Sequence, residues 1–166
     1  MYLFEHTTFL NETQNTNDST FGRMKYDHNW SKSEEYELFG KKYKLKIVAK
    51  AFSGKEINDK ERNAYSKFKK NQDNVLKSVS SKMIKYINDN LDDIKEEYSK
   101  ISKINNESEL AKVIKPTSIV FGQDGSVVML FECAWDSDNG LAIQIYPSWK
   151  IGAQNLFFII LYDRNA

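Results

Sequence analysis

The stretch of sequence best suited to chemistry is FECAWDSDNGL, residues 131–141, in which an apolar run carries Glu132 and is followed by Asp136. Glu132 and Asp136 have an even spacing, so on an extended strand they share one face. A carboxylate pair in an apolar setting, with one pKa raised, can act as general acid and base. His28, in the segment YDHNW, would complete such a site if the fold brings it near. These residues predict a small hydrolase as one function; the structural alternative is a buried Glu132 that is paired with a Lys or Tyr.

The acidic tip of this stretch is also explained as a turn. Asp138, Asn139 and Gly140 fit a three-residue hairpin loop in which Gly140 takes a positive φ. That loop places Trp135 opposite Ile143 and keeps the apolar side chains on one face, which a one-residue slip would not do. We therefore predict a structural turn at these three residues. An EF-hand calcium loop is excluded, because the glycine stands one position too early.

Other catalytic patterns are missing from the sequence. It contains no Gly-rich phosphate loop, no HExxH motif and no GxSxG motif. Cys133 is the only cysteine, and it alternates with Phe131 and Trp135 on the apolar face, which is typical of an inert core thiol. With two histidines and one cysteine in the chain, we expect no metal site and no cofactor. The missing catalytic set favours a binding protein over an enzyme.

Composition limits the classes of partner. A length of 166 residues with 40% hydrophobic residues suits one domain. The net charge is +1, and all but three of the 24 basic residues are Lys, which does not favour nucleic-acid binding. No apolar run is long enough to span a membrane, and the N-terminus lacks the pattern of a signal peptide. We expect a cytoplasmic protein that binds neither nucleic acid nor membranes.

The N-terminal part of the chain predicts an arm and a hairpin. Residues 1–20 end in a polar run without periodicity and are expected to form a flexible arm, so that the single domain spans residues 21–166. Residues 34–52 predict a hairpin with a two-residue turn at Gly40 and Lys41. The glutamates of this hairpin then face its lysines on one side of the sheet, and its apolar residues meet on the other side.

The remaining segments are a helical region followed by strands. A capping box of Asn58 and Glu61 opens an apolar repeat of threes and fours, which predicts one or two long helices over about residues 58–102. The Asp124-Gly125 pair predicts a hairpin between two apolar strands, and further strands are expected at LAIQIY and NLFFIILYD. The expected fold is α+β: an antiparallel sheet with an N-terminal hairpin, helices packed on one face and a C-terminal β-meander.

Aromatic side chains provide anchors for a protein partner. Tyr146 and Trp149 stand on either side of Pro147 and are expected to be exposed, and Trp135 and Asp136 are the other binding candidates. The leading function is thus a non-enzymatic partner-binding module. The C-terminal segment LFFIILY is a hydrophobic edge, which predicts a homodimer through that strand.

The strands around this stretch resemble a known group of proteins. The segment WDSDNGL, residues 135–141, is similar to a strand–turn motif of small uncharacterised bacterial proteins. The strand GKKYKLKIVA and the segment KIGAQNL extend the resemblance over about residues 35–157. Where the group often has Glu-His, this chain has Asp138 and Asn139, so no role of that histidine is carried over. The resemblance implies a cytoplasmic bacterial domain of unknown activity that binds a partner; some such proteins resemble immunity proteins that neutralise toxins.

Overall fold

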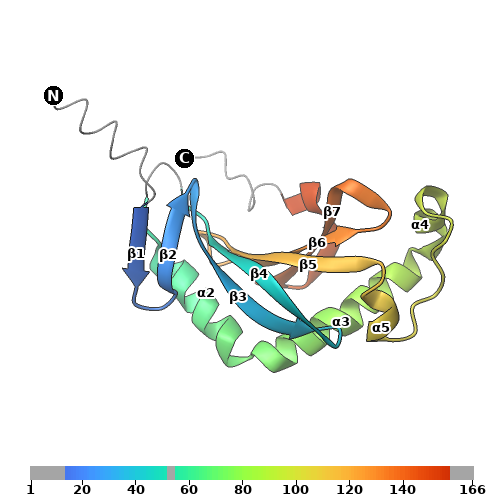
Figure 1. The fold of residues 1–166 in the computed structure, drawn as a ribbon, viewed down its shortest axis with the longest axis horizontal. Helices are drawn as coiled ribbons and strands as arrows, with labels where there is room; N and C mark the ends of the chain where they lie inside the picture. Colours follow the sequence, from blue (N-terminus) through green and yellow to red (C-terminus); the bar gives the residue numbers. More distant parts are fainter. Residues whose placement is uncertain (1–13, 52–54, 158–166) are drawn as a thin grey trace.

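An eight-stranded sheet forms the centre of the part of the protein that the structure describes, and the helices run along one face of this sheet (Figure 1). The structure is a computed structural model that describes residues 14–51 and 55–157. Four α-helices stand between the first four and the last four strands of this part of the chain. The elements are β1 (Gln14–Asp18), β2 (Gly22–Asp27), β3 (Asn29–Leu38), β4 (Lys41–Ala49), α2 (Asp59–Lys70), α3 (Gln72–Asp89), α4 (Leu91–Glu97), α5 (Glu107–Leu110), β5 (Ile114–Phe121), β6 (Val127–Cys133), β7 (Asp136–Tyr146), β8 (Lys150–Ala153) and the 3₁₀-helix η1 (Gln154–Phe157).

The strands lie side by side in the order in which they occur along the chain. All neighbours are antiparallel except β4 and β5, which are parallel. A parallel pair needs a connection that crosses back along the sheet, and the segment with α2 to α5 makes this connection. The predicted α+β class, with a mostly antiparallel sheet, is confirmed.

The helical region contains more helices than the sequence predicted. In place of one or two long helices, residues 59–97 form α2, α3 and α4, with breaks at Asn71 and Asn90. At each break the Asn side chain donates a hydrogen bond to the carbonyl four residues earlier, Lys67 O at 2.9 Å and Tyr86 O at 2.8 Å. Asparagine side chains compete in this way with the helical hydrogen bonds, which explains why the helix stops at these two positions.

The start of α2 agrees with the prediction. Asn58 is the N-cap residue, and its side-chain oxygen accepts a hydrogen bond from the Glu61 N–H at 2.9 Å. Glu61 Oε1 in turn accepts a hydrogen bond from the Asn58 N–H at 3.0 Å. The capping box is therefore complete, and it holds the carboxyl of Glu61 against the end of the helix.

The turn between β3 and β4 is shifted by one residue from the predicted position. The chain turns at Phe39 and Gly40, with φ angles of 58° and 72°, as a type I′ turn requires. Phe39 is held in this conformation because its ring is buried against that of Phe131, with centroids 6.1 Å apart. The predicted faces are nevertheless correct: Glu35 stands opposite Lys44 on the outer face, away from the helices.

The hairpin of β5 and β6 differs from the prediction by a one-residue slip. Val120, and not Phe121, stands opposite Val128. The loop is longer than the predicted two residues, because the Asp124 side chain accepts a hydrogen bond from the Ser126 N–H at 2.9 Å. This local contact closes the turn in a form that the Asp-Gly signal alone does not predict.

The turn predicted at Asp138, Asn139 and Gly140 is wrong. The chain reverses at Ala134 and Trp135, and the predicted turn residues form a bulge in β7. The Ala134 N–H donates to Val113 O at 2.9 Å, which fixes the reversal at this earlier position. The predicted positive φ of Gly140 is confirmed, at 67°.

Both ends of the described chain depart from the predicted pattern. Gln14–Asp18, which the sequence analysis assigned to a flexible arm, form strand β1 in register with β2. The first 13 residues lie outside the described part. At the other end, residues 155–157 belong to η1 and not to a strand. The remainder of the predicted last strand, and with it the predicted homodimer contact, lies outside the described residues.

Two apolar clusters hold the sheet. The main cluster lies between the sheet and the helices, and a smaller one lies on the outer face, where Phe157 of η1 packs on Val120, Val128 and Ala142. The side chain of Glu132 belongs to the outer face, beyond this smaller cluster. The largest fully buried side chains of the main cluster include Phe21, Tyr36, Phe68, Phe121 and Phe131.

We expect Gly140→Ala to lower the free energy of unfolding by about 3 kcal/mol, because strain at positive φ and overpacking add together. A Cβ at Gly140 would lie 2.5 Å from Phe131 O and 2.7 Å from Gln154 Nε2. The matched control is Gly22→Ala, where φ is also positive but no atom lies within 4 Å of the new Cβ. Urea unfolding should show a loss of only about 1 kcal/mol for the control. Equal losses for the two variants would contradict the close packing at the bulge.

Candidate functional site

The two carboxylates singled out in the sequence do not share an enclosed site. Glu132 is exposed on the outer face of β6, opposite Lys115 of β5, and is not the buried carboxylate that the sequence suggested. Asp136 is half-buried at the start of β7, where its Oδ1 accepts a hydrogen bond from the Asn139 N–H at 3.0 Å. The helices cover the opposite face of the sheet from Glu132, so they provide it with no partner.

His28 lies at the other end of the sheet from these carboxylates. It occupies the β2–β3 turn with its side chain 94% exposed, and its Nε2 lies 3.7 Å from Asp27 Oδ1. Next to His28, Trp30 stands opposite Ala49, and Ala49 stands opposite Phe121 of β5. Glu132 stands opposite Lys115, which is also in β5. Phe121 and Lys115 are six residues apart along this strand, a distance of about 20 Å. The structure therefore does not bring His28 and Glu132 together.

Cys133 is a buried thiol, as the alternation predicted. Burial is the largest cause that raises its pKa above the ordinary value, which keeps it protonated at neutral pH. Its Sγ donates a weak hydrogen bond to Asp136 O at 3.6 Å. These features suit a packing role in the β6–β7 turn.

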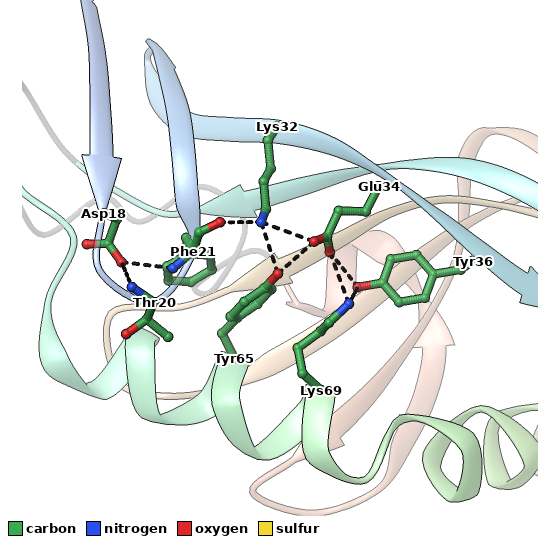
Figure 2. A network of polar contacts seen from close by, with 8 residues as sticks. All are labelled: Asp18, Thr20, Phe21, Lys32, Glu34, Tyr36, Tyr65 and Lys69. Atoms are coloured by element: carbon green, nitrogen blue, oxygen red, sulfur yellow. Dashed lines mark hydrogen bonds and ion pairs between the residues drawn. The ribbon is translucent and has the colours of Figure 1, made fainter.

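The densest group of polar side chains lies between β3 and α2 and is centred on Glu34 (Figure 2). Its Oε1 accepts a hydrogen bond from Tyr36 Oη at 2.6 Å, and Lys69 Nζ lies 3.7 Å from the same atom. Its Oε2 accepts a hydrogen bond from Tyr65 Oη at 2.7 Å and lies 3.0 Å from Lys32 Nζ. We call these five residues the Glu34 network.

Local structure brings the five residues together. Lys32, Glu34 and Tyr36 alternate along β3 and so share its helix-side face. Tyr65 and Lys69 lie four residues apart on α2 and so project from one side of that helix. The alternation of this hairpin was predicted from the sequence. The placement of a Lys and a Glu on the covered face was not predicted, although their even spacing from Tyr36 is the signal that would have identified them.

Electrostatics make this network a structural element. Burial raises the pKa of the Glu34 carboxyl, but the hydrogen bonds from Tyr36, Tyr65 and Lys32 outweigh burial and hold the pKa below its ordinary value. Burial and the Glu34 contacts raise the pKa of both tyrosines well above the ordinary range. Both carboxylate oxygens are engaged and both phenols stay protonated. The network therefore offers no nucleophile or base, and it fixes α2 against β3.

A neighbouring set of contacts ties the β1–β2 turn to the same helix. Asp18 Oδ2 accepts hydrogen bonds from the N–H groups of Thr20 and Phe21, both at 2.9 Å, and its Oδ1 accepts one from Arg62 Nε at 2.9 Å. Lys32 donates to the carbonyl of Phe21 and so joins this turn to the Glu34 network (Figure 2). The contacts of Asp18 and Arg62 explain why β1 is ordered on the sheet edge.

Glu61 has the most strongly perturbed carboxyl group in the described part of the chain. Its side chain is fully buried, and its Oε2 has no hydrogen-bond partner. Burial is the largest cause that raises its pKa to about 7, and Asp18 adds to this rise, whereas the Asn58 N–H and Arg62 oppose it. A group sealed from solvent in this way can respond to pH, but it cannot contact a substrate.

The β7–β8 turn carries the exposed aromatic residue of the described chain. Trp149 is 37% exposed, and Lys82 Nζ of α3 lies 5.1 Å from its ring centroid. Tyr146 is half-buried, with Lys67 Nζ of α2 at 4.3 Å from its ring centroid. Of the predicted binding residues, Tyr146 and Trp149 thus lie near α2 and α3, whereas Trp135 is half-buried in the β6–β7 turn at the other end of β7.

Glu132, Asp136 and His28 line neither of two shallow grooves on the described part of the chain. One, of about 370 Å³, lies between the β3–β4 turn and α3, and the other, of about 470 Å³, follows β1. Within the described residues, no three His, Cys, Asp or Glu side chains are grouped as a metal site would need. The helices of this part of the chain are also too short or too polar to cross a bilayer.

We expect Glu34→Gln to lower the free energy of unfolding by about 2 kcal/mol, because Lys32 and Lys69 lose their counter-charge while remaining partly buried. The matched control is Glu35→Gln on the outer face, where the side chain is 67% exposed and only approaches Lys42 at 3.9 Å. The control should change stability by less than about 0.5 kcal/mol. Chemical denaturation of both variants measures their free energies of unfolding. An unchanged value for Glu34→Gln would show that the network contributes little to stability.

The raised pKa of Glu61 predicts that the protein loses stability as the pH rises. The pKa of this carboxyl is about 7 in the folded protein and close to the ordinary glutamate value of 4.5 in the unfolded chain, so the folded state holds the proton more tightly. The resulting loss accumulates between these two values and approaches about 3 kcal/mol above pH 7. Urea unfolding at several pH values should show this decline in the wild type.

Glu61→Gln should remove that decline, because the amide keeps an oxygen for the Asn58 N–H but does not ionise. The control is Glu109→Gln, which occupies the equivalent third position of α5 but is only half-buried. The control should retain the wild-type pH dependence. An unchanged slope in Glu61→Gln would mean that other groups cause the decline.

Comparison with known proteins adds a family but no activity. No curated protein and no solved structure matches the chain. A family model described as a domain of unknown function, DUF6985, matches residues 20–158. The match agrees with the predicted resemblance to proteins of unknown function, and it does not test the Trp135-Asp136 motif. Because the match covers most of the 166 residues, the chain belongs to the DUF6985 family.

Proposed function

We propose that this protein is a non-enzymatic module that binds a protein partner at the β7–β8 turn. The observation that carries the proposal is the position of Trp149, a large aromatic side chain left 37% exposed beside α3. Tryptophan is enriched among the residues that dominate binding energy at protein interfaces. We call Lys67, Lys82, Tyr146 and Trp149 together the turn surface.

Contacts within the protein hold the turn surface in place before a partner arrives. Gln144 Nε2 donates a hydrogen bond to Ser148 O at 2.9 Å and so braces the turn from within. Lys67 and Lys82 hold the two aromatic rings against the helices through cation–π contacts. A side chain that is already ordered loses less conformational entropy on binding, which favours affinity.

The charge of the turn surface indicates the chemistry of the partner. Within residues 14–51 and 55–157, neither Lys67 nor Lys82 forms a salt bridge. A partner with carboxylates around an apolar pocket would supply both the charge and the cavity that this surface lacks. An immunity protein that caps an acidic region of a toxin in the cytoplasm is one module of this type.

The hydrolase alternative stays a prediction and is less well supported by the geometry. It needs Glu132 and Asp136 in one enclosed site, whereas Glu132 is exposed beside Lys115 on the open face of β6. Any activity that Glu132→Gln and Asp136→Asn leave unchanged would remove this alternative.

Tagged protein should capture a stoichiometric partner from a native extract, and Trp149→Ala should weaken that complex at least about 30-fold, as expected for an interface tryptophan. Mass spectrometry identifies the partner, and titration calorimetry with the purified partner measures the loss of affinity. His28→Ala is the control, because His28 is exposed at a distant turn and makes no contact with the turn surface. A partner bound equally by Trp149→Ala and the wild type would place the interface elsewhere.

A further inference from the structure

Among the described residues, strand β8 forms an open edge of the sheet, and exposed apolar side chains stand at both of its ends. Within the described residues, β8 pairs with β7 on one side and with no strand on the other. Trp149 precedes the strand directly, and Leu156 follows it in η1 with 60% exposure. These two are the exposed large hydrophobic side chains of the described chain. An unpaired strand with apolar flanks is a template for pairing with another strand.

The neighbouring elements of the described chain do not cover this edge. After β8 the chain turns over the outer face, where Gln154 Nε2 donates to Phe131 O at 3.1 Å and Phe157 packs near Val128. Trp149 lies on the helix side, under Lys82. The described part of η1 and the β7–β8 turn therefore flank the edge from its two faces, and neither lies along it.

We propose that β8 pairs antiparallel with β8 of a second copy of this chain, about a two-fold axis that passes through Ile151. The pairing joins two eight-stranded sheets into one continuous sheet. It goes beyond the proposed function, since it needs no other protein.

The faces of the strand select this register. In an antiparallel pair, residues directly opposite each other point to the same face of the sheet. Ile151 pairs with Ile143 of the main core and so lies on the helix side, whereas Gly152 pairs with Ala142 of the outer cluster. An axis between two residues would place a helix-side residue opposite an outer-face residue, so the two-fold axis must pass through a residue. With the axis at Ile151, every residue of β8 stands opposite a residue of the second copy or of its flanking turn.

The side chains that meet in this register are compatible. Ile151 stands opposite its own copy, and Trp149 stands opposite Ala153 of the second copy on the helix side. On the outer face Lys150 stands opposite Gly152 of the second copy, so no two like charges are directly opposite. Leu156 lies over Gly152 of its own chain and thus beside this joint.

A second copy is favoured as the occupant because pairing β8 with itself gives a closed dimer. The other open edge of the described sheet, β1, has the polar sequence QNTND and no large apolar side chain. Pairing β8 with β1 would give a head-to-tail contact that continues into a filament, whereas β8 with itself gives an isologous dimer. Four strand residues with two apolar flanks form a small interface, so the dimer should dissociate in a range on the order of 10–100 µM.

The dimer would also place two turn surfaces on the same face of the joined sheet. The two Trp149 residues are then separated by four residues along the strands, about 14 Å. A partner with a repeated or two-fold symmetric surface could engage both at once, which raises avidity without any new contact.

Sedimentation equilibrium over about 1 to 500 µM tests the dimer, because a weak interface of this size is only populated at the upper end. The apparent mass should rise from 19.3 kDa towards twice that value. Leu156→Lys should keep the mass at the monomer value at all concentrations, because its charge would lie beside Lys150 of the second copy, whereas Leu156→Met should behave as the wild type. Leu156 is 60% exposed, so neither variant should impair folding.

Hydrogen exchange of the wild type at the two ends of this range tests the interface itself. The β8 amides that point away from β7 should exchange at least about 10-fold more slowly at high concentration, as amides in a new ladder do. A monomeric mass at every concentration would overturn the inference. So would a dimer with unprotected β8 amides, or one that Leu156→Lys leaves intact. Capture of a different protein through Trp149 would survive any of these results, so the two proposals fail separately.

Discussion

The parallel pairing of β4 with β5 is the constraint on which the rest of this fold depends. Parallel neighbours run in the same direction, so the chain that leaves Ala49 must return along the sheet before β5 begins at Ile114. The return is made on one face, by α2 to α5, and this choice decides which face becomes the main core (Figure 1). The opposite face stays open at Glu132, which explains why the carboxylates of the FECAWD stretch gain no enclosing cavity.

The same crossover creates a problem that the Glu34 network solves. Covering the inner face of β3 places Lys32 and Glu34 under α2, where an unpaired charge would be costly. The helix supplies Tyr65 and Lys69, one turn apart, and both oxygens of Glu34 are engaged. Because hydrogen bonds are more directional than apolar contacts, the network also fixes how α2 sits along the strand. Its function is to position the scaffold, and no reacting group is left free in it.

The buried polar side chains that stabilise the fold and the exposed apolar side chains that could bind a partner lie in different parts of the molecule. The polar side chains with the most perturbed pKa values lie between α2 and the sheet, where they are largely buried. The exposed apolar side chains of the described chain, Trp149 and Leu156, lie at the far edge of the sheet around β8. Clusters of strongly perturbed groups often mark active sites, but here burial without access explains the perturbation. A rigid sheet that presents one apolar edge is a scaffold suited to binding another chain.

The sequence by itself determined what depends on neighbours along the chain. The capping box fixed the start of α2 at Asn58, and the period of two fixed the faces of β3, β4 and β6, since both follow from contacts a few residues apart. Only the tertiary structure decided the turns and the order of strands. Phe39 adopts a positive φ because Phe131 buries its ring, and the β6–β7 reversal is held at Ala134 by Val113. Because these partners are distant in sequence, local sequence patterns do not predict the contacts. For that reason the predicted turns at Gly40-Lys41 and Asp138–Gly140 were wrong.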